Sequence, residues 1–244
     1  SSQRQIARRG DKCCRWTDAL LRHAAGTVYY CCVVCIVSVR PSRFRTLLYR
    51  RRQETRGGGH QLIYRDTWGG VEPRATRRLY HPTPYVVLTH VGGLSRRCED
   101  LSTCSLEMRN MQADHYIRFG SPDIGQNFMV GGDGNVYVGR GWDVSNFHVN
   151  SNVVVIFSGD YSKIHATPRQ LDATQRLLAL GVSMGKLSED YKLIGHNQST
   201  FTLSPGPNLF SEISKWPHWY NCSYKMETTC GAEINWPPMW STAY

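Results

Sequence analysis

The sequence predicts an α/β fold in which a central mixed β-sheet is flanked by helices, with a single membrane-anchor helix near the N-terminus. Three β-rich runs and two segments of helical periodicity predict the folded part. An uncharged stretch early in the chain predicts the anchor. With 244 residues, of which 41% are hydrophobic, the chain can bury one substantial core. We therefore expect one main domain with appendages.

The three β-rich runs are dominated by β-branched and aromatic residues, which favour strands. They are Tyr85–His90, Asn127–Arg140 and Asn152–Gly159. Asp133-Gly134 divides the second run and is a strong hairpin signal. We therefore expect two antiparallel strands there.

Two helices are expected from apolar periodicity and from a capping pattern. Between residues 99 and 119, apolar residues recur at three- and four-residue steps, which marks one helix face. A second helix is predicted to begin at Thr167, where Thr167-Pro168-Arg169-Gln170 combines a capping box with a proline in the first turn. Strands and helices in this order predict helices packed on a mixed sheet.

The formal charge of +10 is concentrated at the N-terminus. Residues 1–66 contain 14 Lys and Arg against 4 Asp and Glu, whereas residues 67–219 contain 14 against 13. A domain that binds nucleic acid should have its basic face on the folded part. We therefore expect no nucleic-acid partner.

The uncharged stretch runs from Ala24 to Val39. Sixteen helical residues span about 24 Å, short of a hydrocarbon core of about 30 Å. Arg22 and Arg40 flank the stretch and can snorkel toward the headgroups. A short buried helix is the alternative, but the polar and basic surroundings favour a single membrane anchor. Because the chain opens with Ser1, we also expect a further upstream part.

These observations divide the chain into five parts. They are a basic juxtamembrane segment (1–23), a candidate transmembrane helix (24–39), a basic and glycine-rich linker (40–66), a main folded domain (67–219) and a C-terminal tail (220–244).

Four cysteines follow the anchor as two close pairs, Cys98 with Cys104 and Cys222 with Cys230. Cys98 and Cys104 bracket the start of the first predicted helix, so we expect a disulfide between them; the pairing of Cys222 with Cys230 is left open. Paired cysteines suit an oxidising compartment. Two glycosylation patterns, Asn197-Gln198-Ser199 and Asn221-Cys222-Ser223, point the same way. We therefore expect a single-pass protein of the cell membrane with its folded domain outside.

An ordered set of sequence blocks between Trp68 and Trp219 resembles a known family. The blocks are YVVLTH, the Cys98 and Cys104 pair, DIGQNFMVGGDGNVYVGRGWD, IFSGDY, YKLIGHNQSTFTLSPG and ISKWPHW. They are similar to the peptidoglycan recognition protein domain, which is related to phage-type zinc amidases. The resemblance implies a groove on one sheet face that holds the stem peptide and sugar of cell-wall fragments. In family members that are enzymes, zinc at the groove floor cleaves the bond between the muramyl lactyl group and L-alanine.

The resemblance also implies three zinc ligands and two catalytic groups. His196 and Thr202 match a zinc histidine and the threonine that stabilises the oxyanion. Thr89, Gln126 and Ser204 stand where the enzymes have the other histidine, a tyrosine and a cysteine. A neutral hydroxyl does not replace an imidazole or a thiolate as a zinc ligand. We therefore expect no catalytic residues, no metal, no cofactor and no amidase activity.

The candidate ligand-binding groove comprises seven residues, namely His90, Arg140, Trp142, His148, His196, Thr202 and Ser204. A structural role for Arg140 and Trp142, and a hydrogen-bonded strand-end role for His196, remain open. Around His148 the chain is shorter than the family pattern, and Gly120-Ser121 replaces a Gly-Trp pair, which would leave the groove incomplete.

The sequence thus predicts a non-catalytic, membrane-anchored receptor or co-receptor of innate immunity. Its expected partners are peptidoglycan fragments or a related receptor chain. Three alternatives remain open, namely a modulator that binds no peptidoglycan, an active zinc amidase with rearranged ligands, and an adhesion or scaffolding ectodomain.

Overall fold

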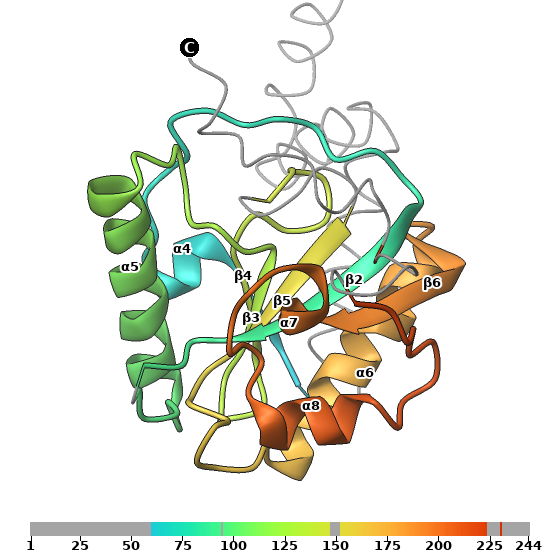
Figure 1. Ribbon diagram of the computed structural model, residues 1–244. Coiled ribbons are helices and arrows are strands. Elements are labelled where there is room, and N and C mark those ends of the chain that lie inside the picture. Colours follow the sequence, from blue (N-terminus) through green and yellow to red (C-terminus); the bar gives the residue numbers. More distant parts are fainter. Residues whose placement is uncertain (1–59, 94, 147–151, 224–229, 231–244) are drawn as a thin grey trace, which may run out of the picture. The chain divides into compact units, whose positions relative to one another are not determined.

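The computed structural model describes residues 60–93, 95–146, 152–223 and residue 230 (Figure 1). Within these residues, six strands form one mixed sheet in the order β1-β4-β3-β5-β2-β6. The strands are β1 (Leu62–Ile63), β2 (Thr83–His90), β3 (Phe128–Val130), β4 (Val136–Val138), β5 (Asn152–Phe157) and β6 (Leu187–Gly195). The helices are α4 (Arg65–Trp68), α5 (Leu101–Arg118), α6 (Pro168–Ser183), α7 (His196–Ser199) and α8 (Pro207–Ile213).

The middle of the sheet is parallel, since β5 and β6 pair with β2 on its two sides in the same direction. The predicted antiparallel pair is confirmed as β3 and β4, with Val130 opposite Val136. In the turn between them, Gly134 has a φ of 82°, which a glycine adopts without strain. The Asp133 carboxylate accepts a hydrogen bond from the backbone N–H of Asn135 at 3.0 Å.

Both predicted helices are confirmed, and both begin with a capping box. The Asp100 carboxylate accepts a hydrogen bond from the N–H of Thr103 at the start of α5. The Thr167 hydroxyl does the same for the N–H of Gln170 at the start of α6. Each cap satisfies an N–H group that the first helical turn leaves unpaired.

Helices cover both faces of the sheet. Because side chains alternate along a strand, Val86 and Leu88 of β2 point into a core cluster that includes residues of α6 and α8. On the opposite face, Met129 and Ile156 pack against Met108 of α5. Figure 1 shows α5 on one side of the sheet, with α6 and α8 on the other. The predicted arrangement of a mixed sheet flanked by helices is therefore confirmed.

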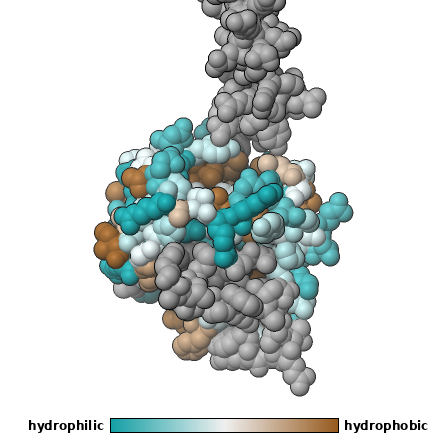
Figure 2. Space-filling view, turned by 90° about the horizontal axis from the view of Figure 1, so that it is seen from above, coloured by the Kyte–Doolittle hydropathy of each residue, from teal (hydrophilic) through white to brown (hydrophobic). Residues whose placement is uncertain are grey.

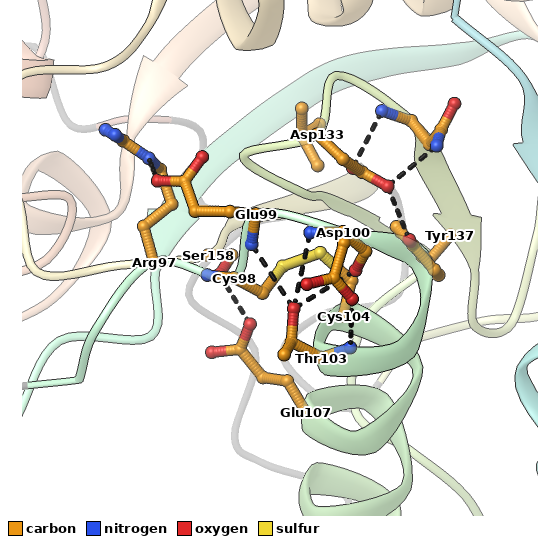
Figure 3. Close-up of a disulfide and its surroundings, with 12 residues drawn as sticks. Arg97, Cys98, Glu99, Asp100, Thr103, Cys104, Glu107, Asp133, Tyr137 and Ser158 are labelled. Atoms are coloured by element: carbon orange, nitrogen blue, oxygen red, sulfur yellow. Dashed lines mark hydrogen bonds and ion pairs between the residues drawn. A yellow bond between two sulfur atoms is a disulfide. The ribbon is translucent and has the colours of Figure 1, made fainter.

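The expected disulfide between Cys98 and Cys104 is present, and it joins the segment before α5 to the first turn of that helix (Figure 3). A loop this short restrains the unfolded chain by about 2–3 kcal/mol. Cys222 and Cys230, whose pairing the sequence left open, also form a disulfide.

The folded part begins earlier than the sequence suggests. Leu62 and Ile63 pair with Val136 and Tyr137 of β4, although they fall in the range 40–66 assigned to a linker. A two-residue strand is too short to show periodicity. The glycine-rich stretch before it therefore led to the assignment of the whole range to a linker. The start of the tail is also ordered, since the N–H of Tyr220 donates to the Leu193 carbonyl.

The candidate anchor at 24–39 lies outside the described residues. Among the helices of the described part, none combines the length and the apolar character that a membrane span requires.

Candidate functional site

The predicted site residues of β2 and β6 meet where these parallel strands end. Leu88 pairs with Gly195, so Thr89 and His90 at the end of β2 lie beside His196, which directly follows β6 and begins α7. Ends of parallel strands are common binding sites because the chain leaves the sheet there in loops.

Ser204 is joined to the end of β2 by a hydrogen bond. Its hydroxyl oxygen accepts from the backbone N–H of His90 at 3.0 Å. The N–H of Ser204 in turn donates to the Thr202 hydroxyl oxygen at 3.2 Å. The structure therefore brings Thr89, His90, Thr202 and Ser204 together with His196.

The three positions at which this chain departs from the enzyme pattern of the family it resembles are buried. The exposed fraction is 4% for Thr89, 7% for Gln126 and 9% for Ser204, whereas His196 and Thr202 are half-buried. Within the described residues, the side-chain oxygen of Gln126 is buried without a hydrogen-bond partner. The residues that remain accessible to a ligand are those that the family pattern retains.

Burial keeps both histidines of the site neutral. It lowers the pKa of His196 to about 4, and the nearby His90 acts in the same direction. Burial also lowers the pKa of His90, against the opposing charge of Asp160. The His90 Nδ1 accepts from the N–H of Tyr161 at 3.1 Å. At neutral pH, the site thus offers two uncharged imidazoles and several hydroxyls.

This set does not fit the zinc ion that the fold family implies. In the part of the chain that the structure describes, no three His, Cys, Asp or Glu side chains are grouped to hold a metal ion. The Ser204 oxygen already accepts a backbone hydrogen bond, and a serine or threonine hydroxyl does not ionise readily at neutral pH.

The lowered pKa of His196 predicts a pH dependence of stability. Protonation favours the unfolded chain, where this pKa returns to about 6.5. The free energy of unfolding should therefore be unaffected above pH 6.5 and fall toward pH 4, by up to about 3 kcal/mol from this group. Urea unfolding of the native chain and of His196→Gln gives the free energy of unfolding that each loses between pH 7.5 and pH 4.5. The difference between these two losses is the contribution of His196. The exposed His165→Gln is the control, and equal losses in the native chain and in His196→Gln would contradict the prediction.

Two predicted groove residues, Arg140 and Trp142, are buried and make internal contacts. The Arg140 guanidinium is buried and donates to the carbonyl of Ile124 at 2.5 Å and to that of Ser145 at 2.7 Å. Trp142 packs on Phe128, with ring centroids 4.6 Å apart, in the core cluster shared with α6. Both hold the fold together, which is the structural role that the sequence left open. His148 lies outside the described residues.

A cavity of about 610 Å³ continues from the end of β2 along α5. Val91, Arg97, Glu107 and Asp114 are among the residues that line it. Burial raises the pKa of Glu107, whose carboxylate accepts from the Ser158 hydroxyl at 2.5 Å. Figure 3 shows Glu107 on α5, beside the segment that contains Cys98. The lining of this cavity is charged and polar, unlike the uncharged group formed by His90, His196, Thr202 and Ser204.

Sequence reasoning missed the role of Gln198. It is buried in α7, where its side-chain oxygen accepts from the N–H of Gly195 at 2.8 Å. Its amide nitrogen donates to the carbonyls of Tyr220 and Cys222 at 2.9 and 2.8 Å. The sequence shows Gln198 only as the middle residue of a glycosylation pattern, so no signal pointed to this contact.

The surface of the described part has both hydrophobic and hydrophilic areas. On the face seen in Figure 2, the hydrophobic residues of the described part lie in separate patches between hydrophilic ones. Phe201 and Leu203, beside the site, are 86% and 87% exposed. The rim of the site therefore offers apolar as well as polar contacts.

Comparison with known proteins gives consistent matches. A family model described as N-acetylmuramoyl-L-alanine amidase matches residues 79–207. The chain is 40% identical over 180 residues to peptidoglycan-recognition protein LA of Drosophila melanogaster, which covers 73% of this chain and 49% of that relative. The chain thus spans about half the length of this relative.

Solved structures of similar proteins include two complexes with tracheal cytotoxin. One contains the ectodomains of peptidoglycan recognition proteins LCa and LCx, with a TM-score of 0.64 and 36% identity over 66% of this chain and 98% of the matched chain. The other contains peptidoglycan recognition protein LE, with a TM-score of 0.64 and 37% identity over 66% of this chain and 96% of the matched chain. In the complex with protein LE, this ligand is described as a monomeric diaminopimelic acid-type peptidoglycan.

Proposed function

Because this chain belongs to the peptidoglycan recognition protein family, which is related to the amidases, we propose that it binds peptidoglycan fragments without hydrolysing them. Similar proteins of known structure are complexed with tracheal cytotoxin. The observation that carries the proposal is the composition of the site. Two imidazoles and several hydroxyls surround the place where an amidase of this fold would hold its metal.

The site retains features that suit recognition of a peptide linked to a sugar. The stem peptide offers amide groups, and a neutral imidazole such as that of His196 can donate or accept one hydrogen bond. The half-buried Thr202 hydroxyl can do both. The exposed Phe201 and Leu203 provide apolar area beside these groups, as binding sites for small ligands commonly do.

Hydrolysis of the ligand requires groups that binding alone does not need. A zinc amidase needs a metal-bound water and a group that stabilises the developing oxyanion. Thr202 stands at the position of the second requirement, but Ser204 and Thr89 do not supply the ligands for the first. We infer a receptor or co-receptor rather than an enzyme.

Titration of the purified full chain with defined muropeptides tests this proposal. We expect micromolar binding of at least one muropeptide, equivalent to about 8 kcal/mol, and no release of free stem peptide above a zinc-only blank. His196→Ala should weaken binding at least several-fold, whereas His165→Ala, at an exposed position, should not. Absence of binding to both diaminopimelate-type and lysine-type fragments, or release of stem peptide, would overturn the proposal.

A related receptor chain is the second candidate partner. It is favoured by the similar structure in which tracheal cytotoxin is bound to a complex of two recognition-protein ectodomains. Mixing this chain with such a receptor should give a complex in sedimentation analysis that depends on the muropeptide. A complex that forms equally without the muropeptide would favour the ligand-free modulator instead.

We also propose that the chain is anchored in the cell membrane, with the recognition domain outside. The uncharged stretch 24–39, the two disulfides and the exposed Asn221 in a glycosylation pattern support this placement. The protein should stay with membranes after a carbonate wash, and protease added to intact cells should cut its C-terminal domain. Release by carbonate, or protection of that domain while an N-terminal tag is removed, would contradict it.

A further inference from the structure

The sequence contains two patterns for the attachment of a sugar chain to asparagine, one at residues 197–199 and one at residues 221–223. Such a sugar chain is bulky and hydrophilic, so a folded domain can carry it only where the asparagine amide faces solvent. Both patterns lie within the described residues. The structure places their two asparagines in different surroundings.

Asn197 is half-buried, and its amide is turned toward the interior. It is the second residue of α7, and its side-chain oxygen is buried. A Cβ atom added to Gly195 would meet that oxygen at 2.9 Å, a ring carbon of Phe210 at 3.0 Å and a ring carbon of Pro205 at 3.1 Å. Because the amide is planar and its oxygen is fixed in this crowded space, a sugar on its nitrogen would begin directly beside these groups.

The serine of the same pattern is also held inside the fold. Ser199 is 8% exposed, and its hydroxyl donates to the His196 carbonyl at 2.9 Å. Between the two, Gln198 accepts from the N–H of Gly195 and donates to the Tyr220 carbonyl. Moving α7 to admit a sugar would break these bonds and displace His196, a residue of the candidate site.

Asn221 lies in an exposed turn. The N–H of Cys222 donates to the Tyr220 carbonyl at 3.1 Å, which makes Asn221 the central residue of a three-residue turn. The buried Gln198 amide donates to the carbonyls of Tyr220 and Cys222, on the two sides of Asn221. The flanking backbone is thus held from the interior, and the Asn221 side chain is left on the outside.

The backbone before this turn is fixed to β6. The N–H of Leu193 donates to the His218 carbonyl at 2.8 Å, and the N–H of Tyr220 donates to the Leu193 carbonyl at 2.9 Å. These bonds use backbone groups alone. A sugar on the Asn221 side chain therefore leaves them intact, whereas a sugar on Asn197 requires α7 to move.

We propose that Asn221 carries an N-linked sugar chain and that Asn197 stays unmodified, although both match the acceptor pattern. The amide nitrogen of Asn221 forms a bond to the anomeric carbon of a lipid-linked oligosaccharide and loses one proton. The bond from that carbon to the lipid diphosphate breaks, and its electron pair leaves with the diphosphate. This inference rests on the proposed placement of the recognition domain outside the cell, because the sugar donor acts on secreted domains.

Peptide mapping of the full chain expressed in insect cells tests the choice of residue. Peptide-N-glycanase in heavy-oxygen water converts each sugar-bearing asparagine to a labelled aspartate. We expect label at Asn221 in most chains, none at Asn197, and the loss of one sugar chain from the mass. Ser223→Ala should abolish the label, as should Asn221→Gln, whereas Ser199→Ala makes the same change in the other pattern and should leave the label unchanged.

A new acceptor pattern controls for the compartment. Lys163→Asn with His165→Thr creates one at two exposed positions of the loop before α6. If position 163 is labelled while Asn221 is not, or if Asn197 is labelled, the inference is overturned and the placement outside the cell stands. If neither position 163 nor Asn221 is labelled, the placement itself fails, and the inference fails with it.

Discussion

Replacing Thr89 by histidine and Ser204 by cysteine should give a chain that binds one zinc ion, whereas the native chain should bind none specifically. The register places residue 89 beside His196, and the loop places residue 204 against the end of β2. The double variant would thus supply two imidazoles and a thiolate, which leaves one tetrahedral position for water. Because His196 is already neutral at pH 7, it needs no deprotonation before binding metal.

The metal should be detectable in two ways. Equilibrium dialysis should give about one zinc per chain, and zinc at 100 times its dissociation constant should add about 2.7 kcal/mol to the free energy of unfolding. Ser204→Cys loses the hydrogen bond from the His90 N–H, which costs about 1 kcal/mol in the metal-free variant. Release of stem peptide should lag behind metal binding, because the family resemblance implies that Gln126 takes the place of the catalytic tyrosine.

Ser204→Cys alone is the control and should bind no zinc, since the first ligand is still missing. Stoichiometric zinc in the native chain would contradict the prediction, and it would favour an amidase with rearranged ligands. Failure of a folded double variant to bind zinc would show that the two positions lie too far apart.

Arg140→Met should lower the free energy of unfolding by about 3–5 kcal/mol, the usual range when one partner of a buried charged network is removed. The guanidinium donates to the Ile124 and Ser145 carbonyls and to the Ser121 hydroxyl at 3.1 Å. Methionine fills a similar volume but leaves these acceptors buried without a donor. Burial lowers the pKa of Arg140, yet the side chain stays charged at neutral pH because a guanidinium does not lose its proton in proteins.

Urea unfolding at pH 7 measures this loss. Arg176→Met is the matched control, because Arg176 forms an exposed i,i+4 pair with Asp172 on α6 and such pairs contribute less than about 1 kcal/mol. A loss below about 1 kcal/mol for Arg140→Met would show that water replaces the guanidinium and that Arg140 does not fix the fold.

The sequence predicted best those features that depend on residues close together in the chain. The hairpin at Asp133-Gly134 and the cap at Thr167 are local signals, and both are confirmed. The Cys98–Cys104 disulfide is equally local. Pairing of Leu62 with Val136, by contrast, joins two remote segments, and a two-residue strand leaves no periodic pattern to recognise.

The site was predictable only in part for the same reason. The resemblance placed Thr89, His196 and Ser204, and the structure brings them together. The resemblance does not separate residues that contact a ligand from residues that support the fold, and it placed Arg140 and Trp142 among the candidate groove residues. Both are in blocks that resemble the family, but their contacts are internal. No pattern in the sequence indicates that Gln198 connects α7 to the C-terminal segment.

The pairing of the C-terminal segment with Leu193 has a consequence for the behaviour of the protein in solution. A strand at the margin of a sheet presents unpaired N–H and C=O groups, onto which a strand from another molecule can add. His218 and Tyr220 occupy these groups of Leu193 on the outer side of β6, while the opposite margin, β1, has only two residues. Both margins are thus poor templates for intermolecular strand addition, so removing residues 218–223 should make the protein prone to aggregate through β6.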